Sequence, residues 1–156
     1  MIKEGDKIIF LDIDGVLNND KTLARTPQGF VGINSTLTSR LKNIVKETKA
    51  KIVLSSSWRV NYVKYYTSDT DSKYLIRLLG YKDLKIEGST TITGSNRGWQ
   101  IKQYIEEHKI KTFVILDDEF ENEFAEYNLT KHLVHTDSML GLTRENVEQA
   151  IKILQN

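Results

Sequence analysis

Two aspartates stand two residues apart where an apolar run ends, in the segment IIFLDIDGVLNND at residues 8–20. Asp12 and Asp14 could share one reaction, because one carboxylate can attack a phosphorus centre while the other handles protons. The attack would form an acyl-phosphate, and the second acid would protonate the departing oxygen and then deprotonate the water that clears the intermediate. Gly15 would let the chain turn sharply, since it has no Cβ. The segment predicts a phosphoryl-transfer site, although a tight turn capped by its own side chains would use the same string.

Four apolar runs recur along the chain, at residues 7–13, 51–55, 112–116 and 132–136. Each is too continuous for a half-exposed strand, which predicts buried parallel strands. Segments with helical spacing separate them, and residues 83–88 predict a weaker edge strand after a helix at 71–79. Polar loops are expected at 18–34, 66–72 and 88–98. The pattern predicts an α/β fold, a Rossmann-like three-layer sandwich with a mostly parallel five-stranded sheet.

The composition limits the domain number, the compartment and the cofactor chemistry that can be expected. With 156 residues, 39% of them hydrophobic, the chain fits a single domain over residues 1–156 with a proper core. It has no cysteine, which excludes disulfides and thiolate metal sites and favours a reducing compartment, with the cytoplasm expected by default. The first residues are charged and no apolar run approaches roughly 20 residues, so neither a secretory signal nor a membrane span is expected. The net charge of +1 argues neither for nor against a nucleic-acid partner.

Ligands of a parallel sheet bind at the carboxyl ends of its strands. Three serines at 55–57 follow the second apolar run, and Asp117 and Asp118 follow the next long one. With Asp12 and Asp14, four carboxylates come to one edge, where they would repel one another unless a cation neutralises them. An oxygen-rich site of this kind suits Mg²⁺. Taken singly, the serines fit a helix cap and the later acids fit a helix start, but their convergence favours a site.

Four motifs in this order resemble the haloacid dehalogenase (HAD) superfamily of Mg²⁺-dependent phosphotransferases. FLDIDGVLN at 10–18 is similar to the first motif and IVLSSSWR at 52–59 to the second. The third is a Lys or Arg near the start of the helix before the fourth strand, for which Arg97 is the first choice and Lys102 the alternative. FVILDDE at 113–119 is similar to the fourth. The combination resembles in particular the small HAD domains associated with RNA-repair proteins.

The resemblance implies a HAD-like fold without a sizeable cap domain and a role for each matching residue. Asp12 would be the nucleophile and Asp14 the acid/base. Ser55 would hydrogen-bond the transferring phosphoryl group, and Arg97 would offset its charge.

The resemblance also implies the metal ligands. Asp117 and Asp118 would hold Mg²⁺ together with Asp12 and the main-chain carbonyl of Asp14. Three further residues are candidates for contacting the substrate: Ser56, Arg59 and Lys102.

The expected substrate follows from the missing cap. Residues 18–34 leave room for a hairpin-like flap, and residues 60–96 hold mainly the expected helix, strand and loops. A capless site in this family is open and favours phosphates on large substrates, which implies a terminal phosphate, most plausibly a 3′-phosphate, on DNA or RNA, with partner repair enzymes. Aromatic and basic side chains after the second motif suit single strands, although the tyrosines fit packing equally well: Trp58, Arg59, Tyr62, Lys64, Tyr65 and Tyr66.

Three alternatives remain. A small-molecule phosphatase such as a nucleotidase would use the same residues. A catalytically idle module that binds phosphorylated ends would have no need of both Asp12 and Asp14. A glycosyltransferase that holds a nucleotide sugar through Asp-x-Asp would leave Ser55 and the second acid pair unexplained.

Overall fold

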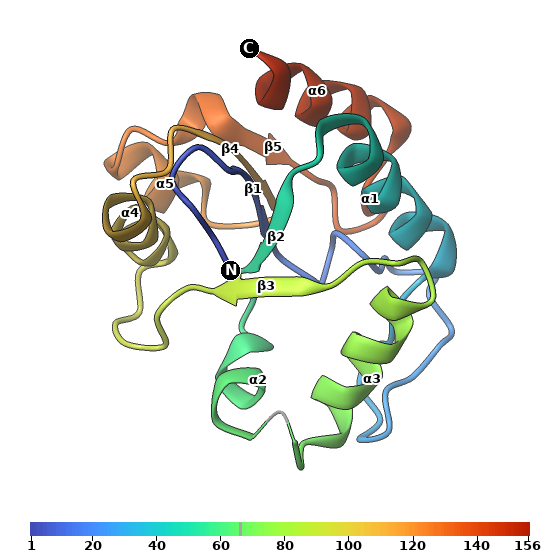
Figure 1. Ribbon diagram of the computed structural model, residues 1–156. Coiled ribbons are helices and arrows are strands. Elements are labelled where there is room, and N and C mark those ends of the chain that lie inside the picture. Colours follow the sequence, from blue (N-terminus) through green and yellow to red (C-terminus); the bar gives the residue numbers. More distant parts are fainter. Residues whose placement is uncertain (66) are drawn as a thin grey trace.

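A computed structural model describes residues 1–65 and 67–156; Tyr66, which belongs to the predicted aromatic patch and to the predicted loop 66–72, lies outside the described residues. Within them a five-stranded sheet runs in the order β3-β2-β1-β4-β5, and every paired neighbour is parallel (Figure 1). The strands are β1 (Lys7–Leu11), β2 (Lys51–Leu54), β3 (Ile86–Ser89), β4 (Thr112–Asp117) and β5 (Leu133–His135). The predicted α/β class and the edge position of β3 are confirmed.

Helices cover both faces of the sheet and make three layers (Figure 1). The helices are α1 (Ser35–Thr48), α2 (Arg59–Tyr65), α3 (Thr70–Gly80), α4 (Arg97–His108), α5 (Glu121–Glu126) and α6 (Arg144–Gln155), with a 3₁₀ turn at Thr130–His132. One core joins α1, α3 and α6 to one face, and a second core joins α4 and α5 to the other. β1 supplies both cores because its side chains alternate: Ile8 and Phe10 point to the α4 side, whereas Ile9 and Leu11 point to the α1 side.

Side-chain caps determine where several helices begin. Asn34, Asn96 and Thr143 each accept a hydrogen bond from a backbone N–H in the first turn of α1, α4 and α6. Such caps satisfy donors that the first turn of a helix leaves without a partner. The cap at Asn96 therefore starts α4 at Arg97, directly beside the carboxyl edge of the sheet.

The first strand is shorter than the predicted run 7–13. It ends at Leu11, because the backbone N–H groups of Val16 and Leu17 both bond to the carbonyl of Ile13 and close a turn. Gly15 occupies this turn with φ +81°, a conformation that favours glycine. Asp12 thus lies directly beyond the strand, and Asp14 lies in the turn that follows it.

The segment 18–34 folds over this turn as the expected flap. An antiparallel bridge joins Arg25 to Val31, and Thr26 N donates to Phe30 O across 2.8 Å. The flap is a short hairpin, and the described chain has no sizeable cap domain. None of the described helices is long and apolar enough to cross a membrane, and a cytoplasmic location stays a prediction.

Candidate active site at the carboxyl edge of the sheet

Strand register aligns the first residue beyond each central strand. Leu11 pairs with Leu54 of β2 and with Leu116 of β4. The next backbone bonds continue these ladders: Asp12 N donates to Leu116 O and Ser55 N donates to Leu11 O, both at 3.0 Å. One row across the sheet edge therefore holds Ser55, Asp12 and Asp117. Because β1 lies where the strand order reverses direction, this row occupies the usual ligand position of such sheets.

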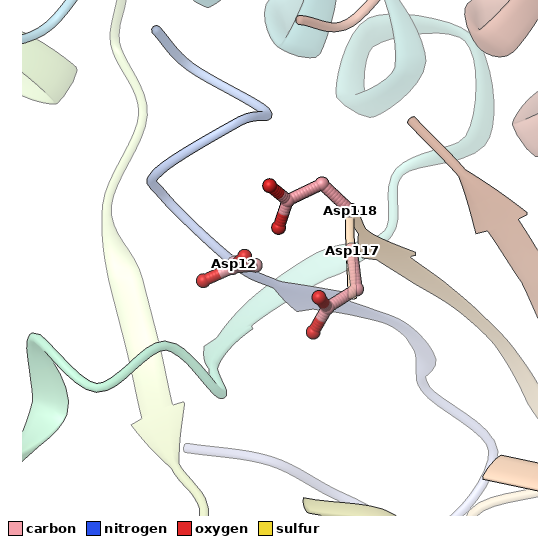
Figure 2. Close-up of side chains that lie close together, drawn as sticks. All are labelled: Asp12, Asp117 and Asp118. Carbon is pink, nitrogen blue, oxygen red and sulfur yellow. The ribbon is translucent and has the colours of Figure 1, made fainter. Parts of the chain in front are cut away.

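Three carboxylates gather at this row (Figure 2). Oxygens of Asp12, Asp117 and Asp118 lie within 4.8 Å of one another. Asp12 and Asp117 are buried, whereas Asp118 is half-buried. Burial raises the pKa of Asp12 well above its ordinary value, and the charge of Asp117 raises it further. Burial likewise raises the pKa of Asp117, against the opposing charge of Arg97.

A hard divalent cation fits this donor set. The three carboxylates supply oxygen ligands, and their mutual repulsion is the reason that a positive charge among them would be favourable. Gly15 keeps the space for Asp118, because a Cβ on Gly15 would lie 2.1 Å from Asp118 Oδ2. The hydroxyl of Thr136 donates to Gly15 O across 2.8 Å and ties the turn to the end of β5. Asp12, Asp117 and Asp118 are the residues that could hold such an ion.

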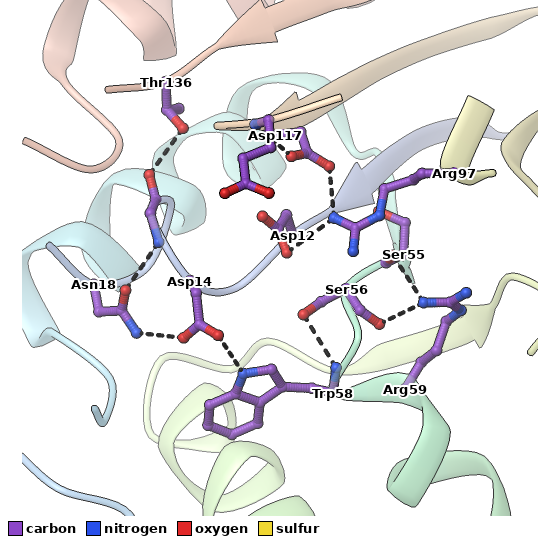
Figure 3. Close-up of polar contacts among 12 residues, drawn as sticks. Asp12, Asp14, Asn18, Ser55, Ser56, Trp58, Arg59, Arg97, Asp117 and Thr136 are labelled. Atoms are coloured by element: carbon purple, nitrogen blue, oxygen red, sulfur yellow. Dashed lines mark hydrogen bonds and ion pairs between the residues drawn. The ribbon is translucent and has the colours of Figure 1, made fainter. Parts of the chain in front are cut away.

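Arg97 places a positive charge beside the acids of the row. Its Nη1 lies 2.9 Å from Asp117 Oδ2 and 3.4 Å from Asp12 Oδ1 (Figure 3). The ring of Phe120 lies 4.4 Å from the guanidinium carbon, and the Glu123 carboxylate accepts a bond from the Arg97 backbone N–H. The first turn of α4 thus fixes Arg97 against the acids.

Asp14 occupies a different environment from Asp12. It is exposed, and its two oxygens accept hydrogen bonds from different side chains. Asn18 Nδ2 donates to Oδ1 at 2.9 Å, and Trp58 Nε1 donates to Oδ2 at 3.1 Å (Figure 3). The Asp14 carboxylate is therefore held beside the acid cluster but is not one of its members.

Ser55 and its neighbours occupy the second position of the row. Ser55 is fully buried, and its Oγ has no hydrogen-bond partner among the described residues. Ser56 Oγ accepts from Trp58 N at 3.2 Å, so this serine caps the turn that leads into α2. A buried hydroxyl without a partner is costly unless a ligand satisfies it, which makes Ser55 a candidate for contact with a bound group.

Arg59 and Lys102, both predicted to contact the substrate, lie in unlike places. Arg59 is 5% exposed, and its guanidinium donates to the carbonyls of Ser55, Ser56 and Thr91. It holds the loop after β2 against the loop after β3, a different use from the predicted one. Lys102 pairs with Glu106 on the surface of α4, 3.9 Å away. The structure brings Arg97, and not Lys102, to the acids.

The aromatic residues predicted to border the site also lie in unlike places. Trp58 and Tyr62 pack partly against the larger core, whereas Tyr65 is 55% exposed. Asn18 has no predicted role, although its spacing of four residues from Asp14 inside a Gly-containing turn is a usable signal. Thr90 has no predicted role either, and its buried hydroxyl has no partner within the described chain. The backbone N–H of Thr90 donates to the carbonyl of Leu54, and this bond places Thr90 at the row. No sequence pattern reveals it.

A parallel α/β sheet with a buried acid cluster, an arginine and a free serine hydroxyl at its carboxyl edge defines a class of phosphate-handling domain. Residues 8–147 match the family described as the HAD domain in Swiss Army Knife RNA repair proteins. The chain belongs to this family, and at the family level it is a HAD-type phosphatase, a hydrolase of a class that typically uses a divalent metal. A comparison with curated proteins finds no match.

Proposed function

We propose that this chain is a Mg²⁺-dependent phosphomonoesterase that works through an aspartyl-phosphate on Asp12 and removes a 3′-phosphate from an RNA or DNA end. The observation that carries the proposal is the position of the Asp12 carboxylate. It lies within 4.8 Å of oxygens from Asp117 and Asp118 and 3.4 Å from the guanidinium of Arg97. A nucleophile set among metal-type ligands and a cation has the surroundings that phosphoryl transfer needs.

The reaction divides between the two acids of the first motif. A carboxylate oxygen of Asp12 attacks phosphorus, and the bond from phosphorus to the sugar oxygen breaks as Asp14 gives that oxygen a proton. Asp14, now ionised, then takes a proton from a water molecule that attacks the aspartyl-phosphate and releases inorganic phosphate. The hydrogen bonds from Asn18 and Trp58 support this role, because they orient the Asp14 carboxylate.

Other residues of the row would bind the transferring group. The guanidinium of Arg97 would offset the charge on the phosphoryl oxygens, and the Ser55 hydroxyl would donate a hydrogen bond to one of them. When bound, Mg²⁺ would supply further positive charge at the same oxygens. Asp12, Asp117 and Asp118 would hold it, together with the Asp14 carbonyl.

The family description supports a nucleic-acid end as the substrate, since it refers to RNA repair proteins. The short flap supports it too, because a site without a cap domain leaves room for a large molecule beside the phosphate. Partner repair enzymes would then make or use the dephosphorylated end. A mononucleotide is the alternative substrate that the same residues would accept.

Phosphate release tests the proposal. The wild-type protein and Asp12→Asn would be compared, with Mg²⁺ and with EDTA, on a 3′-phosphorylated oligonucleotide, a 5′-phosphorylated one, mononucleotides and p-nitrophenyl phosphate. We expect metal-dependent release from the 3′ end that is lost in the variant. Faster release from mononucleotides would favour a nucleotidase, and no release from any substrate would favour an idle module that binds phosphorylated ends.

A further inference from the structure

A cavity of about 370 Å³ opens beside Asp14, and Asp118 does not line it. Its lining includes Asp14 and Trp58, Phe30 and Val31 of the flap, and Asn61 of α2. Figure 3 shows the indole of Trp58 directly next to the Asp14 carboxylate. The volume lies near the lower end of the range for small-molecule sites, roughly 300–1,000 Å³. The cavity thus suits one ring system with its sugar and is too small for a length of chain.

The flap wall of this cavity is held in place by the start of α3. Gln28 N donates to Asp71 Oδ1 at 3.1 Å, and Gln28 Nε2 donates to Asp69 Oδ1 at 2.9 Å and to Thr70 Oγ1 at 3.1 Å. Even so, the ring of Phe30 stays 66% exposed at the cavity mouth. An aromatic side chain that is uncovered beside a reactive group, on a backbone held by hydrogen bonds, is a surface for a ligand.

The charges around the cavity restrict that ligand. Its charged lining residues are Asp14, Asp69 and Asp71, and within the described chain no lysine or arginine lines it. A second phosphate would be repelled here, whereas an uncharged aromatic ring with N–H groups would be attracted. A second cavity that Asp14 also lines has mainly polar lining residues, Asp118 among them, and no aromatic side chain of the described residues. Stacking is therefore available on the Trp58 side only.

We propose that this cavity binds the base of the nucleoside whose oxygen Asp14 protonates. The inference rests on the proposed function and adds a subsite to it. The base lies against Phe30 and Trp58, and the rest of a nucleic-acid chain leaves the cavity on another path, because the acidic lining repels the next phosphate. Trp58 connects the two parts of the site, since the same indole contacts the base and bonds to Asp14.

The first experiment compares substrates that differ only in the base. The ratio of kcat/KM would be measured for 3′-phosphorylated oligonucleotides that end in adenosine or in an abasic sugar. We expect the wild type to prefer the base by more than about tenfold, because one aromatic–base contact is worth about tenfold and two aromatic side chains contact the base. Phe30→Ala should lower the ratio by about tenfold. Leu23→Ala is the matched control, because Leu23 is 90% exposed on the same flap and does not line the cavity.

Acetyl phosphate separates this inference from the proposed function, because it carries no base. Two results together would support both proposals: the wild type and Phe30→Ala hydrolyse acetyl phosphate at equal rates, and the base preference is lower in the variant than in the wild type. If acetyl phosphate is hydrolysed but the wild type acts on the two oligonucleotides at equal rates, the base subsite is overturned and the proposed phosphatase function stands. Faster release from a phosphoserine peptide than from either oligonucleotide would also overturn the subsite.

A binding measurement keeps the inference testable without turnover. The chain has two tryptophans, so Trp99→Phe leaves Trp58 as the single tryptophan, whose emission can be excited apart from that of the tyrosines. Adenosine should quench the Trp58 emission. Adding Phe30→Ala should raise the adenosine concentration needed for half-maximal quenching by about tenfold. Quenching in a protein that releases no phosphate would retain the base subsite and reject the phosphatase. No quenching by adenosine would overturn the subsite.

Discussion

Arg97 and Asp117 form a buried ion pair, with Nη1 of the arginine 2.9 Å from Oδ2 of the aspartate. Burial acts to lower the pKa of Arg97, but the charges of Asp117 and Asp12 outweigh it and raise that pKa. The pair joins the first turn of α4 to the end of β4, and its cation also faces Asp12. The same contact therefore supports both the fold of the sheet edge and the charge balance of the candidate site.

Arg97→Met should remove both contributions. Leaving buried acids without their cation should cost about 3 kcal/mol in the free energy of unfolding, and loss of the group that binds phosphoryl oxygens should lower kcat by about 10²–10³-fold. Urea unfolding and phosphate release measure the two effects. Lys102→Met on the same helix should change stability by less than about 0.5 kcal/mol, because its pair with Glu106 is on the surface. An equal loss of activity in Lys102→Met would contradict the assignment of Arg97.

Gly15→Ala should displace Asp118. The new Cβ would lie 2.1 Å from Asp118 Oδ2, and φ at this position is +81°. Gly5→Ala is a matched control, since φ there is +93° and nothing lies within 4 Å of the added carbon. Both variants should lose about 1–2 kcal/mol to backbone strain, but only Gly15→Ala should lose Mg²⁺ binding in a calorimetric titration. Undiminished Mg²⁺ binding by Gly15→Ala would argue that Asp118 is not a ligand.

Mg²⁺ should stabilise the wild-type protein against unfolding. At free Mg²⁺ ten times the Kd, the gain should be about 1.4 kcal/mol, because only the folded state brings the three acids together. Asp118→Asn should lose most of this gain. Asp83→Asn should keep it, because Asp83 is exposed in the turn before β3 and takes no part in the acid cluster. Thermal unfolding with Mg²⁺ and with EDTA gives the comparison, and an equal gain in Asp118→Asn would exclude the proposed ligand set.

The Asp12 carboxyl should make the metal-free protein less stable as pH rises above about 3.8. The pKa of Asp12 is raised in the folded state, so between about 3.8 and that raised value the folded state binds more protons than the unfolded chain. The contribution of Asp12 to stability is therefore fully present below the pKa that Asp12 has in the unfolded chain. It is lost as pH rises through the higher pKa that Asp12 has in the folded protein. Asp12→Asn should flatten this dependence, measured by urea unfolding in EDTA. A slope unchanged from wild type would show that Asp12 does not cause it.

The sequence by itself determined the sheet and the acids at its edge. Short continuous apolar runs favour buried strands, and the positions of Asp12, Ser55 and Asp117 at the ends of these runs are read directly from the sequence. The helices followed from spacing along one face, as in α1 and α6. The edge strand β3 was also predicted, with its start displaced by three residues from 83 to 86.

The tertiary structure alone decided which partners those residues meet. Nothing in NRGWQIKQYI shows that Arg97 reaches Asp117, since this contact depends on the angle at which α4 packs. The pair of Lys102 with Glu106, in contrast, is an i,i+4 contact within the helix, which the spacing alone allows. The bonds from Arg59 to Thr91 and from Trp58 to Asp14 join segments that are remote in sequence. Burial of apolar runs depends on composition and periodicity, which a sequence displays. A hydrogen bond depends on ångström distances between separate elements, which exist only once the layers have packed.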